Sequence, residues 1–405
     1  MLHCDPNLYS MIKVGITGQP GFVGTHLFNT LGLQPDKFER VPFEDAFFSN
    51  ESKLKEFVRS CDAVVHLAAM NRHNDPEVLY QTNIGLVKQL IAACEATNSK
   101  PHILFSSSTQ EERDNLYGKS KKEGRKLLEQ WAERNHAHFT GFIIPNVFGP
   151  FGNPYYNSVV ATFCHQLTHN ETTKIEVDGE IKLIYVGELV KHFIEKIKEH
   201  SVTLNKTTVK HSRKISDGSG QARTSCETVL IPHTTEIKVS ALLDKITAFK
   251  VNYFEKGILP SLENSFDRNL FNTFLCYIDH ASFFPFNLKL NSDSRGNFVE
   301  TMRLHSGGQV SFSTTVPTIT RGNHYHTRKA ERFAVIKGKA RIDIRRIGTD
   351  KIISFALDGK EPSFVDMPIW YSHNITNIGE EELYTIFWIN EHFDANDPDT
   401  FIEKV

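Results

Sequence analysis

The spacing of apolar and polar residues divides the chain into two regions. Up to about residue 148, short apolar runs alternate with stretches whose apolar positions recur at helical spacing. Three of the runs predict buried strands, namely Ile12–Thr17, Ala63–Ala68 and His102–Ser106. The intervening stretches predict helices over Val23–Leu31, Val78–Ala96 and Lys119–Asn135. Alternation of this kind is typical of an α/β domain with a doubly wound parallel sheet and helices on both faces.

The pattern changes after about residue 206. Lys210–Thr224 is polar and rich in Gly and Ser and predicts an exposed loop, whereas Glu236–Lys250 and Asp267–Ile278 have helical periodicity. From Leu288 onward the pattern predicts strands without intervening helices: Phe298–Arg303, Val310–Thr315, Arg332–Ile336, Ala340–Arg345, Ile352–Ala356 and Leu383–Ile389. Many short strands predict an all-β sandwich or small barrel. We therefore expect two domains, residues 1–278 and 279–405.

Composition narrows the classes of partner. The chain has 405 residues, 40% hydrophobic and 23% charged, enough to fill two ordinary cores. Its 46 basic and 48 acidic residues leave a formal net charge of −2 without a basic stripe, which argues against a nucleic-acid partner. The cysteines form no Cys-x-x-Cys pair, no signal peptide is recognisable, and no apolar run approaches the ~20 residues of a membrane span. We expect a soluble, cytoplasmic protein.

A glycine-rich turn follows the first predicted strand and opens the first helix. Gly18, Gly21 and Gly24 lie in the sequence Thr-Gly-Gln-Pro-Gly-Phe-Val-Gly, where glycines permit a tight turn and close backbone approach to a pyrophosphate. About 20 residues on, a charged residue should recognise the ribose of a dinucleotide. Glu39 would accept from the 2′-hydroxyl of NAD, whereas Arg40 would bind the 2′-phosphate of NADP. For Glu39, a solvated charge at the strand end is the plainer interpretation.

A serine-rich strand end and a Tyr-x3-Lys pair form a second constellation. Residues 106–109 are Ser-Ser-Ser-Thr, and Tyr117 and Lys121 share one face of a predicted helix. A lysine ammonium beside a phenol lowers the phenol pKa, so that the oxygen can pass a proton near neutral pH. A serine hydroxyl at the strand end can donate to the same substrate carbonyl. Each feature occurs by chance in many proteins, but their order downstream of the glycine-rich turn favours a proton-transfer site.

The second half of the chain contains a set of metal-ligand residue types. His324 and His326 share one face of a predicted strand, and Glu331 and His373 follow on later strands. Three imidazoles and a carboxylate suit a divalent ion, Zn²⁺ above all, and leave room for one exchangeable ligand. Any single histidine among the 19 is more readily structural. The full spacing, His-x-His-x4-Glu-x6-Gly and then Pro-x4-His-x3-Asn, is much more specific.

Residues 12–150 resemble the extended short-chain dehydrogenase/reductase family, whose dinucleotide-binding domain is of the Rossmann type. The matching features are the glycine-rich turn, the strand end His66-Leu67-Ala68-Ala69, Asn83 in the following helix, the serine-rich strand end, the Tyr-Gly-x-Ser-Lys helix and the stretch 145–149. The resemblance implies hydride transfer between NAD(P) and a hydroxyl or keto group of a nucleotide sugar.

The same resemblance implies residue roles. Ser108 would polarise the carbonyl, Tyr117 would donate the proton, and Lys121 would bind the nicotinamide ribose and tune Tyr117. Pro145 and Val147 would contact the nicotinamide through backbone groups. Further implied cofactor contacts are Gly18, Gly21, Phe22, Val23, Gly24, Arg40, Leu67, Ala68, Ala69 and Asn83. Implied substrate contacts are Arg72, Asn146, Tyr156 and Asn157.

The histidine spacings are similar to the two motifs of the cupin family, a jelly-roll barrel, which implies that the four residues named above bind a metal. Two positions depart from the motifs: Trp370 stands where a glycine is usual, and the first-motif glycine is displaced to Gly322. Residues 293–300, Asp-x-Arg-Gly-x-Phe-x-Glu, are similar to a stretch of cupin-class nucleotide-sugar 3,5-epimerases. In such enzymes a base removes the proton beside a keto group. A polar turn is the alternative interpretation of this stretch.

A reductase of this kind fused to such a cupin closely resembles one family along nearly the whole chain, the capsular-polysaccharide enzymes CapF, also called WbjC or FnlB. The family implies a homodimeric, bifunctional enzyme that uses NADPH. Its cupin would epimerise C3 of a UDP-2-acetamido-2,6-dideoxy-4-hexulose, and its reductase would then reduce C4 to give UDP-2-acetamido-2,6-dideoxy-L-talose, on the route to UDP-N-acetyl-L-fucosamine. One alternative is a UDP-sugar reductase whose cupin only binds metal and dimerises. The other is a non-catalytic redox sensor, which the intact Tyr117 and Lys121 disfavour.

Overall fold

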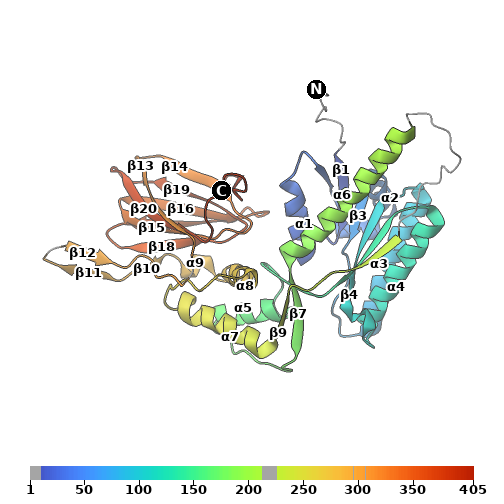
Figure 1. Cartoon of the computed structure of the whole chain (residues 1–405), viewed down its shortest axis with the longest axis horizontal. Coiled ribbons are helices and arrows are strands. Elements are labelled where there is room, and N and C mark those ends of the chain that lie inside the picture. Colours follow the sequence, from blue (N-terminus) through green and yellow to red (C-terminus); the bar gives the residue numbers. More distant parts are fainter. Residues whose placement is uncertain (1–10, 212–225, 295, 306) are drawn as a thin grey trace. The chain divides into compact units, whose positions relative to one another are not determined.

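The computed structural model describes residues 11–211, 226–294, 296–305 and 307–405. The chain forms two compact units, whose elements are labelled in Figure 1. The first unit comprises the chain up to Val147 together with Lys182–Glu236, and the second comprises Phe148–Ile181 together with Ile237–Val405. The chain therefore passes between the units three times. The expected division between residues 278 and 279 separates the predicted reductase residues from the predicted cupin residues, and it stays a prediction.

A six-stranded parallel sheet forms the centre of the first unit, in the order β2-β1-β3-β4-β5-β8. The strands are β1 (Ile12–Thr17), β2 (Phe38–Val41), β3 (Ala63–His66), β4 (His102–Ser108), β5 (Phe139–Ile144) and β8 (Cys226–Leu230). From β1 the chain adds β2 on one side of the sheet and then β3 on the other side, so the direction of strand addition reverses between β1 and β3. Sheets of this type bind ligands beyond the carboxyl ends of the strands at such a switch point. The predicted α/β class is confirmed.

Helices cover both faces of this sheet. They are α1 (Phe22–Gly32), α2 (Glu51–Ser60), α3 (Pro76–Thr97), α4 (Leu116–Asn135) and α6 (Val186–His211), with short 3₁₀ turns η1 (Asp45–Ser49) and η2 (Thr109–Glu112). Leu27 of α1 and Phe193 of α6 share one hydrophobic core with Val65 of β3. Trp131 of α4 belongs to the other core, with Val64. Neighbouring residues of β3 thus point into different cores, as the alternation along a strand requires.

The second unit combines helices with an antiparallel barrel. The helical elements are α5 (Val159–Thr168), α7 (Val239–Phe249), the π-turn η3 (Lys250–Phe254), α8 (Ser265–Leu275) and α9 (His280–Phe283). One five-stranded sheet has the order β10-β18-β15-β20-β13, and the other has the order β17-β16-β19-β14-β21. The hydrophobic core includes residues of strands from both sheets, which is the arrangement of the predicted all-β domain.

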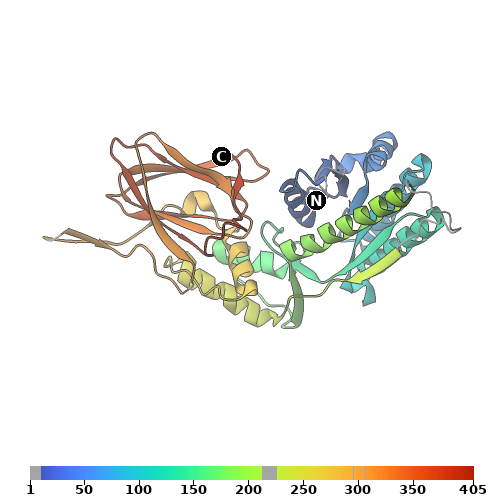
Figure 2. The same cartoon turned by 45° about the horizontal axis from the view of Figure 1, so that its top comes forward.

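The barrel strands have these bounds: β10 (Phe286–Asn287), β13 (Gln309–Thr315), β14 (Thr320–Tyr325), β15 (Glu331–Lys337), β16 (Lys339–Arg346), β17 (Ile352–Asp358), β18 (Ser363–Met367), β19 (Tyr371–Asn377), β20 (Leu383–Ile389) and β21 (Phe401–Ile402). A separate hairpin, β11 (Leu290–Asp293) with β12 (Gly296–Val299), projects from the barrel in both Figure 1 and Figure 2. A further small sheet consists of β6 (Asn146–Phe148), β7 (Glu180–Tyr185) and β9 (Thr235–Lys238).

A buried ionic network joins η3 to the barrel within the second unit. Arg332 of β15 donates to both carboxylate oxygens of Asp366 at 2.8 Å, and to the carbonyl of Gly257 at 2.7 Å. The hydroxyl of Tyr253 donates to the same carboxylate at 2.5 Å. The guanidinium also stacks on Phe364, 3.5 Å from the ring centroid. Because a buried charge is tolerated only when it is paired, this network holds residues 250–257 to the barrel.

Most predicted elements are present, and three expectations need correction. The strand predicted over Phe298–Arg303 ends at Val299, and Arg303 instead pairs with Glu300 at 2.6 Å. The helix predicted over Glu236–Lys250 begins at Val239, because the preceding residues belong to β9. The predicted loop Lys210–Thr224 lies mostly outside the described residues, and its first two residues end α6.

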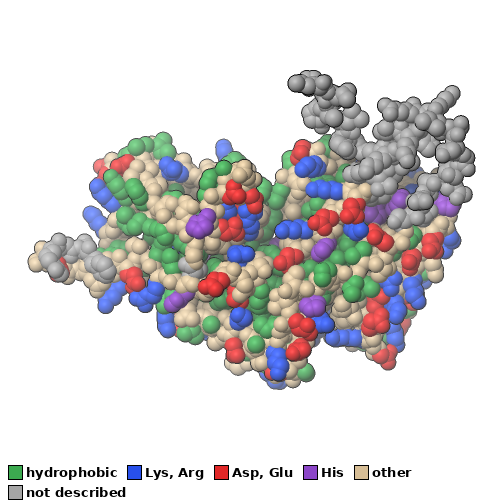
Figure 3. All heavy atoms as spheres, viewed as in Figure 1, with side chains coloured by type: hydrophobic (Ala, Val, Ile, Leu, Met, Phe, Trp, Pro, Cys, Tyr) green, Lys and Arg blue, Asp and Glu red, His purple; other side chains and the backbone are tan. Residues whose placement is uncertain are grey.

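Within the described ranges, no helix is both long and apolar enough to cross a bilayer. The face shown in Figure 3 carries Lys and Arg side chains interspersed with Asp and Glu. The expected lack of a nucleic-acid partner stays a prediction.

Candidate active site and metal centre

The glycine-rich turn connects β1 to α1 as predicted. Gly18 has a left-handed φ of 70°, and a Cβ there would lie 2.8 Å from the backbone nitrogen of Ala68, so the turn requires glycine. A Cβ on Gly24 would lie 2.4 Å from the carbonyl oxygen of Gly18, because α1 starts in close contact with the turn. The backbone nitrogen of Gly21 donates to the same carbonyl at 3.0 Å. The first helical residues are Phe22 and Val23. This is the geometry that binds a pyrophosphate.

Strand β2 carries the two charged residues that predict different cofactors. Successive residues of a strand point to opposite faces, so Glu39 and Arg40 do not face the same site. Glu39 lies 3.9 Å from Lys13 of the paired strand, and both side chains are about half exposed. The guanidinium of Arg40 stacks on the ring of Phe28 in α1, 4.2 Å from its centroid, and donates to the carbonyl of Phe28 at 3.3 Å. Arg40 is thus held beside the helix that starts at the glycine-rich turn.

The segment after β3 is ordered by two polar residues. It contains the predicted cofactor residues Leu67, Ala68 and Ala69. The hydroxyl of Thr17 accepts from the backbone nitrogen of Ala68 at 3.3 Å. The buried amide of Asn83 accepts from the backbone nitrogen of Met70 at 2.7 Å and donates to its carbonyl at 3.0 Å. It also donates to Ser120 in α4 at 3.1 Å. Asn83 therefore positions this segment, and its own contact with a cofactor stays a prediction.

Ser108, Tyr117 and Lys121 come from β4 and the first turns of α4. A Cβ on Gly118 would lie 2.0 Å from the carbonyl oxygen of Gln110, so this glycine lets α4 start close to the end of β4. The ammonium of Lys121 is buried, donates to the carbonyl of Ser106 at 3.0 Å, and lies 5.8 Å from the ring centroid of Tyr117. Burial lowers the pKa of Lys121 to about 8, which Glu111 partly opposes.

Glu111 is a positioning residue that the sequence analysis missed. Its buried carboxylate accepts from the hydroxyl of Ser107 in β4, and from Arg125 of α4 at 2.9 and 2.8 Å. Burial raises the pKa of the carboxyl, but these hydrogen bonds outweigh burial and hold it below its ordinary value. The ionised carboxylate therefore ties the strand end with Ser108 to the helix with Lys121. A glutamate in a polar turn has no sequence signal for such a role.

The remaining predicted cofactor and substrate residues lie at the end of β5, in β6 and in exposed segments. Pro145 directly follows β5, at the carboxyl end of that strand, and Val147 lies in β6. Asn146 is exposed and donates to the carbonyl of Lys182 at 3.2 Å. Arg72 is exposed in the segment before α3. Tyr156 and Asn157 are exposed residues of the second unit. The cofactor and substrate roles of these residues stay predictions.

The four predicted metal ligands meet inside the barrel. His324 lies on β14 and His326 directly follows it, His373 lies on the paired strand β19, and Glu331 begins β15 of the other sheet. One nitrogen or oxygen atom from each lies within 4.8 Å of all the others. His326, Glu331 and His373 are buried, and His324 is partly buried. A set that is scattered over 50 residues of sequence thus converges on one point.

The polar atoms of this cluster fit a cation. Oε2 of Glu331 lies 2.9 Å from Nε2 of His373 and 3.5 Å from Nε2 of His326. Despite this proximity, the three buried atoms have no well-aligned hydrogen bond within the described part of the chain. Buried polar atoms seldom lack partners unless they serve an ion or a ligand. Three imidazoles and one carboxylate are donors that suit a divalent cation.

Two members of the cluster, His324 and Glu331, are in the ionisation states that metal binding requires. Burial, reinforced by the neighbouring imidazoles, lowers the pKa of His324 to about 4, so this ring is neutral at pH 7. Burial opposes ionisation of Glu331, but contacts with His326 and His373 outweigh it and hold the pKa of the carboxyl below its ordinary value. The cluster therefore offers an ionised carboxylate and a neutral imidazole, the ligand forms that metals require.

The two departures from the cupin motifs have a structural explanation. Gly322 has a φ of 100°, and a Cβ there would lie 2.8 Å from the carbonyl oxygen of His373, so glycine is required at this position. Trp370 has a φ of 62°, the left-handed region that glycine would adopt freely. Its buried ring stacks on Tyr325, 5.7 Å between centroids, and its backbone nitrogen donates to the carbonyl of His326 at 2.7 Å. These contacts compensate for the backbone conformation.

Comparisons with known proteins cover both units. Residues 14–206 match the NAD dependent epimerase/dehydratase family, and residues 291–401 match the polysaccharide biosynthesis C-terminal domain. A UDP-2-acetamido-2,6-beta-L-arabino-hexul-4-ose reductase of Pseudomonas aeruginosa is 33% identical over 394 residues, 96% of this chain and 98% of the relative. The capsular polysaccharide assembling protein CapF from Staphylococcus aureus is 32% identical, with 97% of this chain and 100% of that chain covered and a TM-score of 0.57. A structure of CapF with the inhibitor 3-isopropenyl-tropolone is 30% identical, with the same coverage and a TM-score of 0.54.

Proposed function

The chain belongs to the CapF family of nucleotide-sugar reductases and epimerases, and from this premise we propose that it modifies one UDP-linked deoxy-amino sugar at two sites. The reductase, residues 1–278, reduces C4 of the sugar with NADPH. The cupin, residues 279–405, first inverts C3 of the UDP-2-acetamido-2,6-dideoxy-4-hexulose. The product is UDP-2-acetamido-2,6-dideoxy-L-talose, formed in the cytoplasm on the way to UDP-N-acetyl-L-fucosamine. The observation that carries the proposal is the presence in one chain of a complete Ser–Tyr–Lys set and a complete four-ligand cluster.

The reduction uses three side chains of the first unit. Bound NADPH supplies the hydride for C4. The hydroxyl of Ser108 donates a hydrogen bond to the C4 carbonyl oxygen, and the phenol of Tyr117 delivers the proton to that oxygen. The Lys121 ammonium favours the ionised phenol that is left behind. With a pKa of about 8, Lys121 is still mostly protonated at pH 7.

The preference for NADPH over NADH rests on Arg40. Its guanidinium is held by Phe28 on the side of α1, whereas Glu39 pairs with Lys13. Guanidinium groups bind phosphate through two parallel hydrogen bonds, so Arg40 suits the 2′-phosphate that distinguishes NADPH.

The epimerisation uses the cupin site. The residues His324, His326, Glu331 and His373 hold the metal. A base removes the C3 proton, and C3 is then reprotonated from the opposite face, which inverts its configuration. A bound zinc ion would stabilise, as a Lewis acid, the C4 oxygen that carries negative charge between these two proton transfers. The role of the protein would be to hold such an ion through three imidazoles and one carboxylate beside the substrate.

A second function of the cupin is supported by its own observations. Glu331 lies on one sheet and the histidines lie on or next to the other, so an ion at this site also ties the two sheets together. The edge strand β13 carries Val310 and Phe312, which are 55% and 73% exposed, and Val316 beyond it is 57% exposed. Apolar side chains along a sheet edge favour pairing with a second copy. We therefore include a homodimer in the proposal, and a cupin that only binds metal and dimerises is the alternative.

One assay separates these functions. The UDP-4-keto-6-deoxy-HexNAc and NADPH are incubated with the protein in D₂O, and the products are identified by NMR. We expect deuterium at C3, inverted configuration at that carbon and a hydroxyl at C4. Reduction without deuterium at C3 would leave the cupin as a structural metal-binding module.

A further inference from the structure

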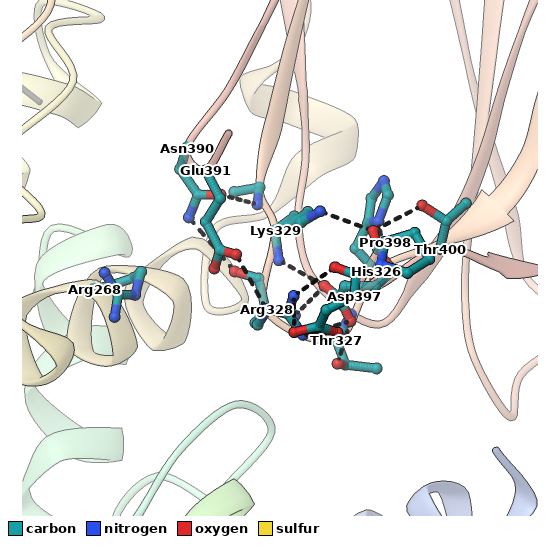
Figure 4. Close-up of polar contacts among 12 residues, drawn as sticks. Arg268, His326, Thr327, Arg328, Lys329, Asn390, Glu391, Asp397, Pro398 and Thr400 are labelled. Carbon is teal, nitrogen blue, oxygen red and sulfur yellow. Dashed lines mark hydrogen bonds and ion pairs between the residues drawn. The ribbon is translucent and has the colours of Figure 1, made fainter. Parts of the chain in front are cut away.

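The C-terminal segment after β20 returns to the metal site and contacts the turn that follows β14. In this turn, residues 326–330, the chain passes from ligand His326 toward ligand Glu331. Figure 4 shows the polar contacts between this turn and residues 390–400. The contacts join parts of the chain about 70 residues apart, so they are tertiary contacts of the barrel. Asp399 makes contacts from both its side chain and its backbone.

The carboxylate of Asp399 is bound by one continuous stretch of backbone. It accepts from the backbone nitrogens of Thr327 at 3.2 Å, Arg328 at 3.0 Å and Lys329 at 3.2 Å. The hydroxyl of Thr327 donates to it at 2.6 Å. Asp399 is 4% exposed, so the carboxylate depends on these donors for its solvation. The side chain therefore fixes the position of Asp399 relative to the turn.

The backbone carbonyl of Asp399 accepts a hydrogen bond from Nδ1 of His326 at 2.5 Å. A carbonyl oxygen can only accept, so Nδ1 of His326 carries a proton. In the neutral ring, which is the form that binds a metal, Nε2 then has the lone pair, and this is the atom that faces Glu331 at 3.5 Å. Histidine ligands of metals are commonly oriented by a hydrogen bond of this kind at the other ring nitrogen.

The conformation of Asp399 shows that this arrangement is imposed by its contacts. Its φ is 45°, in the left-handed region that residues other than glycine seldom adopt. Such conformations persist only when the surroundings determine them. On either side, the carbonyl of Pro398 accepts from the ammonium of Lys329 at 2.8 Å, and Phe401 stacks on Tyr325 with 5.4 Å between centroids. The segment is thus held both before and after Asp399.

The other buried imidazole ligand is oriented by a local contact. Nδ1 of His373 lies 3.1 Å from the carbonyl oxygen of Tyr371, two residues earlier in the same strand. Loss of the C-terminal contacts should therefore affect His326 and leave His373 unchanged. His373 therefore serves as an internal control for His326 in the same protein sample.

We propose that Asp399 is a positioning residue of the metal centre. Its carboxylate locks the C-terminal segment onto the turn, and its carbonyl holds His326 in the tautomer and orientation that present Nε2 to the ion. The inference rests on the metal site proposed above. It assigns to the C-terminal segment a part in metal binding although none of its residues is among the four ligands.

The test compares Asp399→Ala and Asp399→Asn with the matched control Asp397→Asn. Asp397 lies on the same segment and pairs with Arg328 at 2.8 Å, but its side chain is 67% exposed, so its loss should have little effect. The first measurement is the ¹⁵N spectrum of the histidine rings in metal-free protein at alkaline pH, where the His326 ring is neutral although contacts with Glu331 outweigh burial and raise its pKa. We expect His326 to change from the Nδ1–H form to a mixture of tautomers in Asp399→Ala, with His373 as in the wild type.

The second measurement is the zinc affinity of the full chain, which we expect to fall about 10- to 100-fold in Asp399→Ala. Asp399→Asn keeps the shape of the side chain and one acceptor oxygen, so it should fold and lose less affinity than Asp399→Ala. If either folded Asp399 variant keeps both the wild-type tautomer of His326 and zinc affinity within twofold, the inference is wrong. If His326→Ala also keeps zinc at full affinity, the proposed metal site itself is wrong, and the two failures are distinguishable.

Discussion

Lys121 is expected to make the protein less stable while serving the reaction. Its ammonium is buried and donates one hydrogen bond, to the carbonyl of Ser106. Burial lowers its pKa from 10.5 to about 8, and at about 1.4 kcal/mol for each pH unit this corresponds to roughly 3 kcal/mol of unfavourable free energy at pH 7. Lys121→Met removes the buried charge but leaves the Ser106 carbonyl without this donor, which costs about 1 kcal/mol. We therefore expect Lys121→Met to be more stable by about 2 kcal/mol and to lack reductase activity.

Thermal unfolding of the metal-loaded, cofactor-free protein measures the effect. A gain of about 2 kcal/mol should raise the Tm of the first unit by roughly 4–8 °C. Lys119→Met is the control, because Lys119 lies on the same helix with its side chain 56% exposed. Between pH 8 and 10.5 the unfolded chain holds the Lys121 proton that the folded wild type releases, so wild-type stability gains from rising pH. The advantage of Lys121→Met should shrink over this window. A variant no more stable than the wild type at pH 7 would refute the assignment of a destabilising buried ammonium.

Further substitutions test the other sites. Tyr117→Phe should lower the rate of NADPH oxidation about a hundredfold or more while cofactor binding persists, and a near wild-type rate would show that Tyr117 is not the proton donor. Arg40→Ala should weaken binding of NADPH more than NADH in a fluorescence titration, and equal losses would favour Glu39 as a marker of NAD. His326→Ala should lose the bound zinc, as measured by metal analysis, and should stop deuterium exchange at C3. If exchange stops and the melting temperature is unchanged, the metal is catalytic. If exchange stops and the melting temperature also falls sharply, the metal is structural.

The sequence predicts the elements whose periodicity is strong. The bounds of β1 and β20 agree residue for residue with the predicted strands. The fold class of both domains follows from the change along the chain from alternating strands and helices to strands alone. The four metal ligands are predicted because their spacing reflects fixed positions on barrel strands, and they do converge. The helix α2 and the strand β5 were not predicted, although each has buried apolar residues.

The residues that position the sites are not visible in the sequence. Glu111 becomes a link between β4 and α4 only when Ser107 and Arg125 lie on either side of it. Asp399 acts on His326 from 73 residues away. The structural role of Tyr253 is equally hidden in the sequence: its hydroxyl donates a hydrogen bond to Asp366 and so holds η3 to the barrel. Each of these roles depends on tertiary contacts between distant parts of the chain, for which a single sequence has no periodic signal.

The most direct test of two separate chemistries in one chain uses Tyr117→Phe with the UDP-4-keto-6-deoxy-HexNAc substrate and NADPH in D₂O. The substitution removes the proton donor of the first unit and leaves all four ligands of the barrel in place. NMR should show deuterium entering C3 at the wild-type rate while the C4 ketone remains and NADPH is not consumed. A Tyr117→Phe protein that is folded and binds zinc, yet exchanges no C3 proton, would contradict the account of an independent epimerase site in the cupin.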